Sequence, residues 1–167
     1  YKRQGYDVLS FEYRLAPEFP YPAAVEDALR AWDFLMLQGY GALILMSPWT
    51  DMTMSGTSYR ERAEIDPMLT PEYIEAVRLA YAAGQNYRSS DLSPLFADFE
   101  GFPPTLIQVG DHEILYSDSE SLYQAMKRAN VPCRLQVSEG MWHVFQMFPM
   151  KKASIAMDNV ARFLLEQ

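Results

Sequence analysis

The stretch PPTLIQVG, residues 103–110, decides the fold of this chain. Two prolines lead into a largely apolar run, which predicts a strand over residues 105–109. The sequence Ser117-Asp118-Ser119-Glu120 then has the pattern of a capping box and predicts a helix that runs to about residue 129. Alternating apolar and polar residues over 133–137 predict a half-exposed edge strand. A strand, a helix and a strand in this order indicate an α/β protein with a mostly parallel sheet.

The same alternation extends toward both ends of the chain. An apolar run at residues 42–46 predicts a strand buried on both faces of the sheet, and residues 7–13 predict another strand. Helices are expected over residues 22–37, 71–81 and 153–165. The apolar positions of the first of these helices fall on one face, which is expected to be buried: Val25, Leu29, Trp32 and Met36.

Composition and charge narrow the functional classes. A chain of 167 residues is expected to form one domain, over residues 1–167. Its 14 basic residues are scattered among 22 acidic ones, which argues against a nucleic-acid surface. The sequence contains no run of 18 apolar residues, so no membrane span is expected. The single cysteine, Cys133, cannot form an internal disulfide, which fits a reducing compartment, and a cytoplasmic location is expected. Two histidines without ligand spacing predict no metal site, and no cofactor is expected.

The stretch GMWHVF, residues 140–145, carries most of the chemistry. His143 follows the predicted strand 133–137, and Glu113 follows the predicted strand 105–109. A histidine and a carboxylate at two strand ends are the base and the orienting acid of a nucleophilic hydrolase. Asp111 is the alternative acid, while Asp118 is expected to serve the helix N-terminus. No G-x-S-x-G motif accompanies them, so the nucleophile has no visible candidate.

Several segments resemble the hormone-sensitive-lipase family of α/β-hydrolases, in its microbial esterase branch. They are YRLAPE at 13–18, PYPAA at 20–24, ED at 26–27, LMSPWTD at 45–51, SPLF at 93–96 and PPTLIQVG at 103–110. The resemblance covers nearly the whole chain in the order of the family. It implies an α/β-hydrolase fold, a mostly parallel sheet flanked by helices, that is incomplete here: two central strands and the N-terminal part are lacking.

Two functional segments of the family are also lacking. One is an H-G-G-G-like stretch, whose backbone N–H groups form the oxyanion hole. The other is a G-D-S-A-G-type nucleophile elbow, expected between the helix ending near Leu37 and the strand starting at Ala42. The sequence passes there through Gly39-Tyr40-Gly41, so a break in the domain is expected near residues 38–42. These 167 residues alone are expected to be inactive.

The resemblance implies roles for the remaining site residues. Counted through the helix, the acid of the family falls on Glu113, in place of the usual aspartate, and His143 becomes the general base. Ser47 and His112 are interpreted as structural. Four side chains are candidates for the substrate pocket, with ordinary core packing as the alternative: Trp49, Met52, Trp142 and Phe145.

The function implied by the resemblance is that of a carboxylesterase. It would hydrolyse short- to medium-chain acyl esters through a Ser-His-acid triad whose serine is not in this sequence. A non-catalytic fragment or pseudoenzyme of the same fold is the alternative, and a peptidase or lactonase on the same scaffold is a third hypothesis. The expected partner is a small-molecule ester, and a homodimer through the edge strand 133–137 is expected by analogy with the fold.

Overall fold

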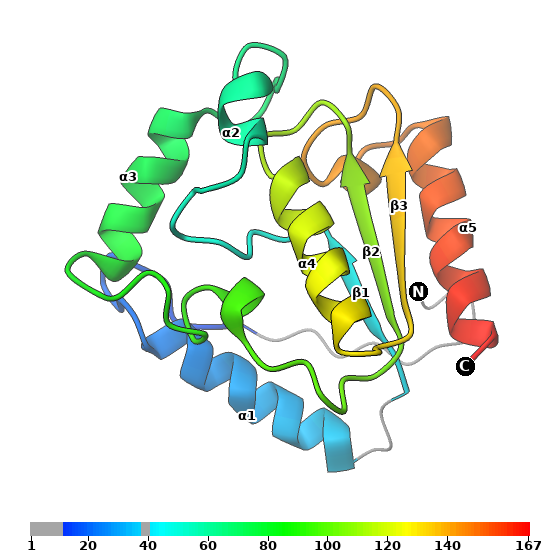
Figure 1. Ribbon diagram of the computed structural model, residues 1–167, viewed down its shortest axis with the longest axis horizontal. Coiled ribbons are helices and arrows are strands. Elements are labelled where there is room, and N and C mark those ends of the chain that lie inside the picture. Colours follow the sequence, from blue (N-terminus) through cyan, green and yellow to red (C-terminus); the bar gives the residue numbers. More distant parts are fainter. Residues whose placement is uncertain (1–11, 38–40) are drawn as a thin grey trace.

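The computed structural model describes residues 12–37 and 41–167, with a three-stranded parallel sheet at its centre (Figure 1). The strands, in their order across the sheet, are β1 (Leu43–Met46), β2 (Thr105–Gly110) and β3 (Cys133–Ser138). At the carboxyl end, Gly110 of β2 pairs with Ser138 of β3. The loops that follow these two strands therefore emerge side by side. The predicted α/β class with a mostly parallel sheet is confirmed.

One helix covers each face of the sheet. These helices are α4 (Tyr116–Arg128) and α5 (Lys151–Leu165), and both agree with the predicted ranges to within two residues. Successive residues of a strand point to opposite faces. Accordingly, Ile107 of β2 packs with Leu122 of α4, whereas its neighbour Leu106 packs with Val160 of α5. The sheet and its two helices form the three layers that position the site.

The strand β1 is less buried than its sequence predicts. Each of its residues is only half-buried, while every residue of β2 is buried. Within the described sheet, β1 pairs with β2 alone, so no described strand lies along its other edge. The strand packs on both faces of the sheet, as predicted, with Leu45 in the cluster of α4 and Ile44 in that of α5, but its burial is incomplete.

The strand β3 lies at the opposite edge of the described sheet, as predicted. Its alternation fails at the carboxyl end, where Val137 is 45% exposed and Gln136 is half-buried. The side-chain oxygen of Gln136 accepts a hydrogen bond of 3.0 Å from Nε2 of Gln108 in β2. This hydrogen bond satisfies the side chain of Gln136 in a half-buried position, whereas the alternating pattern predicts that Gln136 is exposed.

Helix α1 (Ala23–Leu37) forms where its apolar spacing and its first-turn proline predict a helix. The expected burial of its apolar face is wrong at Leu29, which is 56% exposed, and Phe34 is 52% exposed. Figure 1 shows α1 at the periphery, away from the two faces that α4 and α5 cover. Among the described residues, these side chains have no layer against which to pack.

Between β1 and β2 the chain leaves the sheet, as predicted. The elements of this excursion are α2 (Ser58–Glu61), α3 (Pro71–Ala82) and the 3-10 turn η2 (Pro94–Phe96). The predicted helix over residues 71–81 is confirmed, and the Thr70 hydroxyl accepts the N–H of Tyr73 at 3.2 Å as its cap. The predicted strand 7–13 lies almost wholly outside the described residues, as do residues 38–40 of the expected break.

The capping box predicted for α4 is wrong. The helix starts at Tyr116, its N-cap residue is Leu115, and the N–H of Ser117 donates to the hydroxyl of the distant Ser58 at 2.9 Å. The Asp118 carboxylate instead accepts the backbone N–H groups of Thr50 and Asp51, each at 2.8 Å. Those two N–H groups belong to buried residues and need an acceptor, which the sequence pattern of the helix cannot reveal. Asp118 thus fastens α4 to the loop that follows β1.

Asp118 also makes stability depend on pH. Burial raises the pKa of its carboxyl group from 3.8 to about 6, although the hydrogen bonds from Thr50 and Asp51 oppose the change. The folded state therefore favours the protonated acid. The resulting stabilisation is complete below about pH 4 and is lost as the pH rises to about 6. At about 1.36 kcal/mol per pKa unit, the loss reaches about 3 kcal/mol.

The variant Asp118→Asn keeps an oxygen acceptor but cannot ionise. Relative to the unchanged chain, its free energy of unfolding is expected to rise by up to about 3 kcal/mol between about pH 4 and about pH 7.5. Urea unfolding at both pH values measures this difference. Asp98→Asn, on the exposed surface, is the control. A difference between Asp118→Asn and the unchanged chain that is equal at both pH values would contradict the prediction.

Candidate active site

The loop after β3 carries His143 to the carboxyl end of the sheet. The side chain of His143 is 22% exposed. The next residue, Val144, has φ 44° and ψ 39°, a left-handed conformation that is costly for a β-branched residue. The 3-10 turn η3 (Phe145–Met147) follows, and its fully buried Phe145 packs against Ala153 of α5. The packing of Phe145 against α5 thus holds the loop in place, although the backbone of Val144 is strained.

The acidic partner of this histidine comes from the neighbouring strand. Glu113 follows β2 by three residues and has no exposed surface. Nδ1 of His143 lies 3.2 Å from Oε2 of Glu113. These residues meet across 30 positions because β2 and β3 are adjacent and end together. A carboxylate on Nδ1 favours the proton on that nitrogen, which leaves Nε2 to accept a proton from elsewhere.

The other carboxylate oxygen of Glu113 is fully engaged. Oε1 accepts the N–H of Gly110 at 2.6 Å and the hydroxyl of Ser47 at 2.9 Å. The same Ser47 oxygen accepts the N–H of Val144 at 3.0 Å. Ser47 is buried and has φ 49°, so the end of β1 is held in a left-handed turn. One hydroxyl therefore joins the end of β1 to the acid and to the histidine loop.

Asp111, the alternative acid, has a different partner. Its Oδ1 accepts the N–H of Gly140 at 2.6 Å, which fixes the turn that precedes His143. The same oxygen lies 3.8 Å from Nε2 of His112, whose side chain is 47% exposed. Neither Asp111 nor His112 makes a described hydrogen bond to His143. This geometry favours Glu113 over Asp111 as the partner of the histidine.

Gly110 allows the histidine loop to lie directly on the end of β2. A Cβ atom at this position would be 2.0 Å from the carbonyl oxygen of Met141 and 2.8 Å from the nitrogen of Trp142. The loop is also held there by the N–H of His112, which donates to the oxygen of Met141 at 2.9 Å. No side chain fits between the strand and the loop.

A buried glutamine supports the loop from inside the sheet. Gln108 of β2 is 1% exposed, and its Nε2 donates to the Gln136 side chain at 3.0 Å and to the Ala156 carbonyl at 2.8 Å. Its Oε1 accepts from Nε2 of Gln146 at 3.1 Å. Gln146 belongs to η3, so this network links β2, β3, α5 and the turn that follows the histidine.

The four pocket candidates lie in different surroundings. Phe145 is fully buried, and Met52 is 8% exposed in a cluster with Leu92, so both have the packing of core residues. Trp49 and Trp142 are half-buried. The ring of Trp142 meets that of Phe148 edge-on, with 5.7 Å between the centroids. Of the four, the two tryptophans are the more exposed and present the most surface that a ligand could touch.

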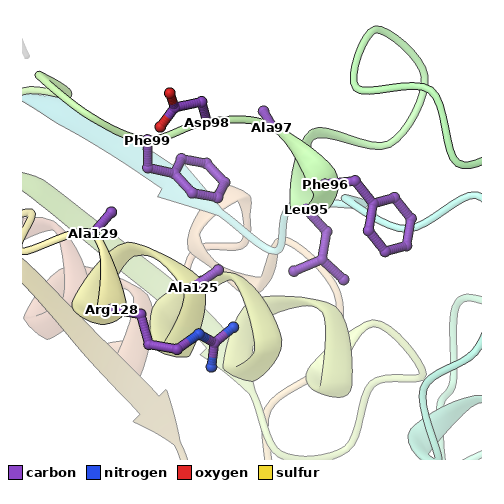
Figure 2. Close-up of a pocket in the computed structure, with 8 residues that line it drawn as sticks. All are labelled: Leu95, Phe96, Ala97, Asp98, Phe99, Ala125, Arg128 and Ala129. Atoms are coloured by element: carbon purple, nitrogen blue, oxygen red, sulfur yellow. The ribbon is translucent and has the colours of Figure 1, made fainter.

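A hollow elsewhere on the surface does not belong to this site. Figure 2 shows it between the segment 95–99 and the end of α4, where Arg128 lies along the helix, and its volume is about 380 Å³. Neither Glu113 nor His143 lines it.

Among the described residues, no three His, Cys, Asp or Glu side chains are placed to hold a metal. No described helix is long and apolar enough to cross a membrane.

Sequence reasoning missed three residues that shape the site. The sequence predicts only a structural role for Ser47 and no role for Gly110 or Gln108. Each of them stands at or near the carboxyl end of a predicted strand, where functional side chains gather in parallel sheets. That position was the available signal. The contacts themselves depend on how three loops meet, which no local pattern records.

A buried carboxylate bonded to Nδ1 of an imidazole, both at the ends of adjacent parallel strands, is the acid–base arrangement of the α/β hydrolases. Comparison with known sequences agrees with this class. The sequence pattern of the α/β hydrolase fold matches residues 2–42 and 37–147. The chain belongs to this family, in its hormone-sensitive-lipase branch.

Two curated relatives illustrate the kinship. An "Esterase" of Acinetobacter venetianus is 31% identical, with 96% of this chain and 65% of that protein covered. An "Acetyl-hydrolase" of Streptomyces hygroscopicus is also 31% identical, with 86% of this chain and 59% of that protein covered. This chain therefore spans less than two thirds of the length of these relatives.

Solved structures give the same result. The hormone-sensitive lipase from a metagenome library has a TM-score of 0.85 and 30% identity, and the match covers 92% of this chain and 65% of that one. The esterase EstE5, soaked with ethyl alcohol, has a TM-score of 0.83 and 34% identity, over 93% of this chain and 64% of that one. The described fold is a part of the fold of these enzymes.

The matched part of the Acinetobacter protein is longer than the matched part of this chain. The match to the Acinetobacter protein runs over 197 residues, whereas 96% of this chain is about 160 residues, a difference of about 37. The two matched parts of the family pattern meet at residues 37–42. This is the place where the sequence predicts a break in the domain.

Proposed function

We propose that this chain carries the acid and the base of a carboxylic ester hydrolase that acts on short- to medium-chain acyl esters. One observation carries the proposal: Nδ1 of His143 lies 3.2 Å from Oε2 of Glu113, a carboxylate with no exposed surface. The names of the two relatives, an esterase and an acetyl-hydrolase, support the same class of reaction.

In the proposed mechanism, His143 acts through Nε2. It takes the proton of a serine hydroxyl as that serine attacks the ester carbonyl, and it then returns the proton to the leaving alcohol. It next activates the water that hydrolyses the acyl-serine. Glu113 orients the ring and stabilises the imidazolium that forms in each step. Burial of Glu113 strengthens this electrostatic effect because little water screens the charge.

The nucleophilic serine and the oxyanion-hole donors lie, in this proposal, in segments of the relatives that these 167 residues do not match. Among the described residues, no serine hydroxyl is hydrogen-bonded to His143. The Ser47 hydroxyl is already engaged with Glu113 and Val144. The extra length of the Acinetobacter protein, together with the junction at residues 37–42, supports a nucleophile segment at that place.

A hybrid protein tests the proposal. The Acinetobacter esterase supplies the parts that this chain does not match, and this chain supplies residues 1–37 and 42–167. The hybrid is expected to hydrolyse p-nitrophenyl butyrate, while the 167-residue chain alone is not. A folded hybrid without turnover would refute the proposal in favour of a non-catalytic fragment. Turnover by the chain alone that disappears in His143→Ala would instead place the nucleophile within these residues.

A further inference from the structure

Ser47 stands where the three loops of the candidate site meet. Its hydroxyl donates to Oε1 of Glu113 at 2.9 Å and accepts the N–H of Val144 at 3.0 Å. The residue is 3% exposed, and its backbone has the left-handed φ of 49°. A serine in this conformation is less stable than a glycine would be, so the hydroxyl is held at a cost in backbone energy.

The hydroxyl decides which carboxylate oxygen faces the imidazole. Oε1 of Glu113 receives two donors, Ser47 Oγ and the N–H of Gly110, and Oε2 is left for His143. A glutamate side chain has one more rotatable bond than an aspartate, so its carboxylate needs an additional restraint to keep one orientation. The Ser47 hydroxyl supplies that restraint.

The same hydroxyl acts on the histidine from its other side. Val144 directly follows His143, and its left-handed backbone is bound to Ser47 through the N–H. A change at Ser47 therefore reaches the imidazole by two routes, through the carboxylate and through the backbone. Neither route requires Ser47 to touch a substrate.

We infer that Ser47 is a positioning residue, whose hydroxyl sets the orientation of the His143 ring by holding Glu113 and Val144 together. The effect of Ser47 on catalysis rests on the proposed function, because it requires His143 to be the general base. The geometric claim concerns the ring itself and can be measured without substrate.

Ser93 provides a matched control. It is also a buried serine, and its hydroxyl likewise joins distant segments, since it accepts the N–H of Met52 at 2.8 Å and donates to the Tyr87 carbonyl at 2.5 Å. It has no hydrogen bond to Glu113 or to the histidine loop. Ser93→Ala and Ser47→Ala thus remove the same kinds of bond, but only the second is expected to affect the ring.

The test is nitrogen NMR of the histidine rings in the 167-residue chain, at a pH where the imidazole is neutral. The chain has two histidines, and a His112→Asn variant assigns the signals of His143. In Ser47→Ala and in Ser47→Gly, the ratio of the Nδ1–H to the Nε2–H tautomer of His143 is expected to fall about tenfold, the net worth of one hydrogen bond. Ser93→Ala is expected to leave the ratio unchanged.

Ser47→Gly also separates the hydroxyl from the backbone, because glycine accepts the left-handed conformation without strain. An unchanged ratio in both Ser47 variants would overturn the inference, as would an equal fall in Ser93→Ala. Loss of the fold in both Ser47 variants would overturn it as well, since a positioning role requires a folded chain with a misoriented ring. An inactive hybrid would refute the proposed function and leave this result intact.

Discussion

Glu113→Gln is expected to lower kcat of the hybrid esterase by about 10³- to 10⁴-fold, with KM nearly unchanged. Oε2 of Glu113 accepts from Nδ1 of His143 at 3.2 Å. A glutamine can instead present its amide N–H to Nδ1, which favours the tautomer protonated on Nε2. Nε2 then has no lone pair with which to take the proton of the nucleophile. Steady-state hydrolysis of p-nitrophenyl butyrate measures the effect.

Asp111→Asn is the control that decides between the two candidate acids. An asparagine oxygen can still accept the N–H of Gly140, so the turn before the histidine is retained. Its kcat is expected to fall less than about tenfold, because no catalytic hydrogen bond is lost. A loss in Asp111→Asn that equals or exceeds the loss in Glu113→Gln would make Asp111 the orienting acid.

The second large effect is expected from Gly110→Ala. The new Cβ would lie 2.0 Å from the Met141 carbonyl oxygen, which belongs to backbone and cannot move without the whole loop. The substitution is expected to lower the free energy of unfolding by about 3 kcal/mol, the upper range for overpacking. For a chain of this length, that corresponds to a Tm lower by about 6–12 °C. Thermal unfolding followed by circular dichroism measures it.

Gly41→Ala is the matched substitution, because a Cβ at Gly41 meets nothing within 4 Å. Its effect is expected to stay within about 0.5 kcal/mol. Equal Tm values for the two variants would show that the histidine loop does not depend on its contact with the end of β2. In the hybrid, Gly110→Ala should also displace His143 and reduce kcat.

The periodic parts of the fold could be predicted from the sequence. The strands over 105–109 and 133–137 and the helix over 71–81 follow from local patterns, and each is present. The burial of β1 and of α1 could not be predicted in this way. Half-exposed Leu45 and exposed Leu29 depend on which neighbours stand beside them, and apolar spacing alone assumes that such neighbours exist.

In the candidate site, too, the features set by local sequence patterns could be predicted, and those set by contacts between distant residues could not. The placement of Glu113 and His143 at two strand ends suggested the pair, because parallel strands bring their carboxyl ends together. The partners of Ser47 and Asp118 were out of reach, since hydrogen bonds between loops 66 to 68 positions apart leave no periodic signal. The local pattern assigned Asp118 to the capping box of its own helix, whereas its carboxylate binds the backbone N–H groups of the distant Thr50 and Asp51.

The left-handed backbone of Val144 has a consequence for any effort to make such a hydrolase more heat-resistant. A β-branched residue at φ 44° lowers stability by roughly 1–2 kcal/mol, so a selection for survival at high temperature would enrich glycine or asparagine at this place. Variants chosen in that way would loosen the residue next to the imidazole. Such variants would gain thermal stability and lose catalytic activity. A screen for both properties together would be needed to avoid that outcome.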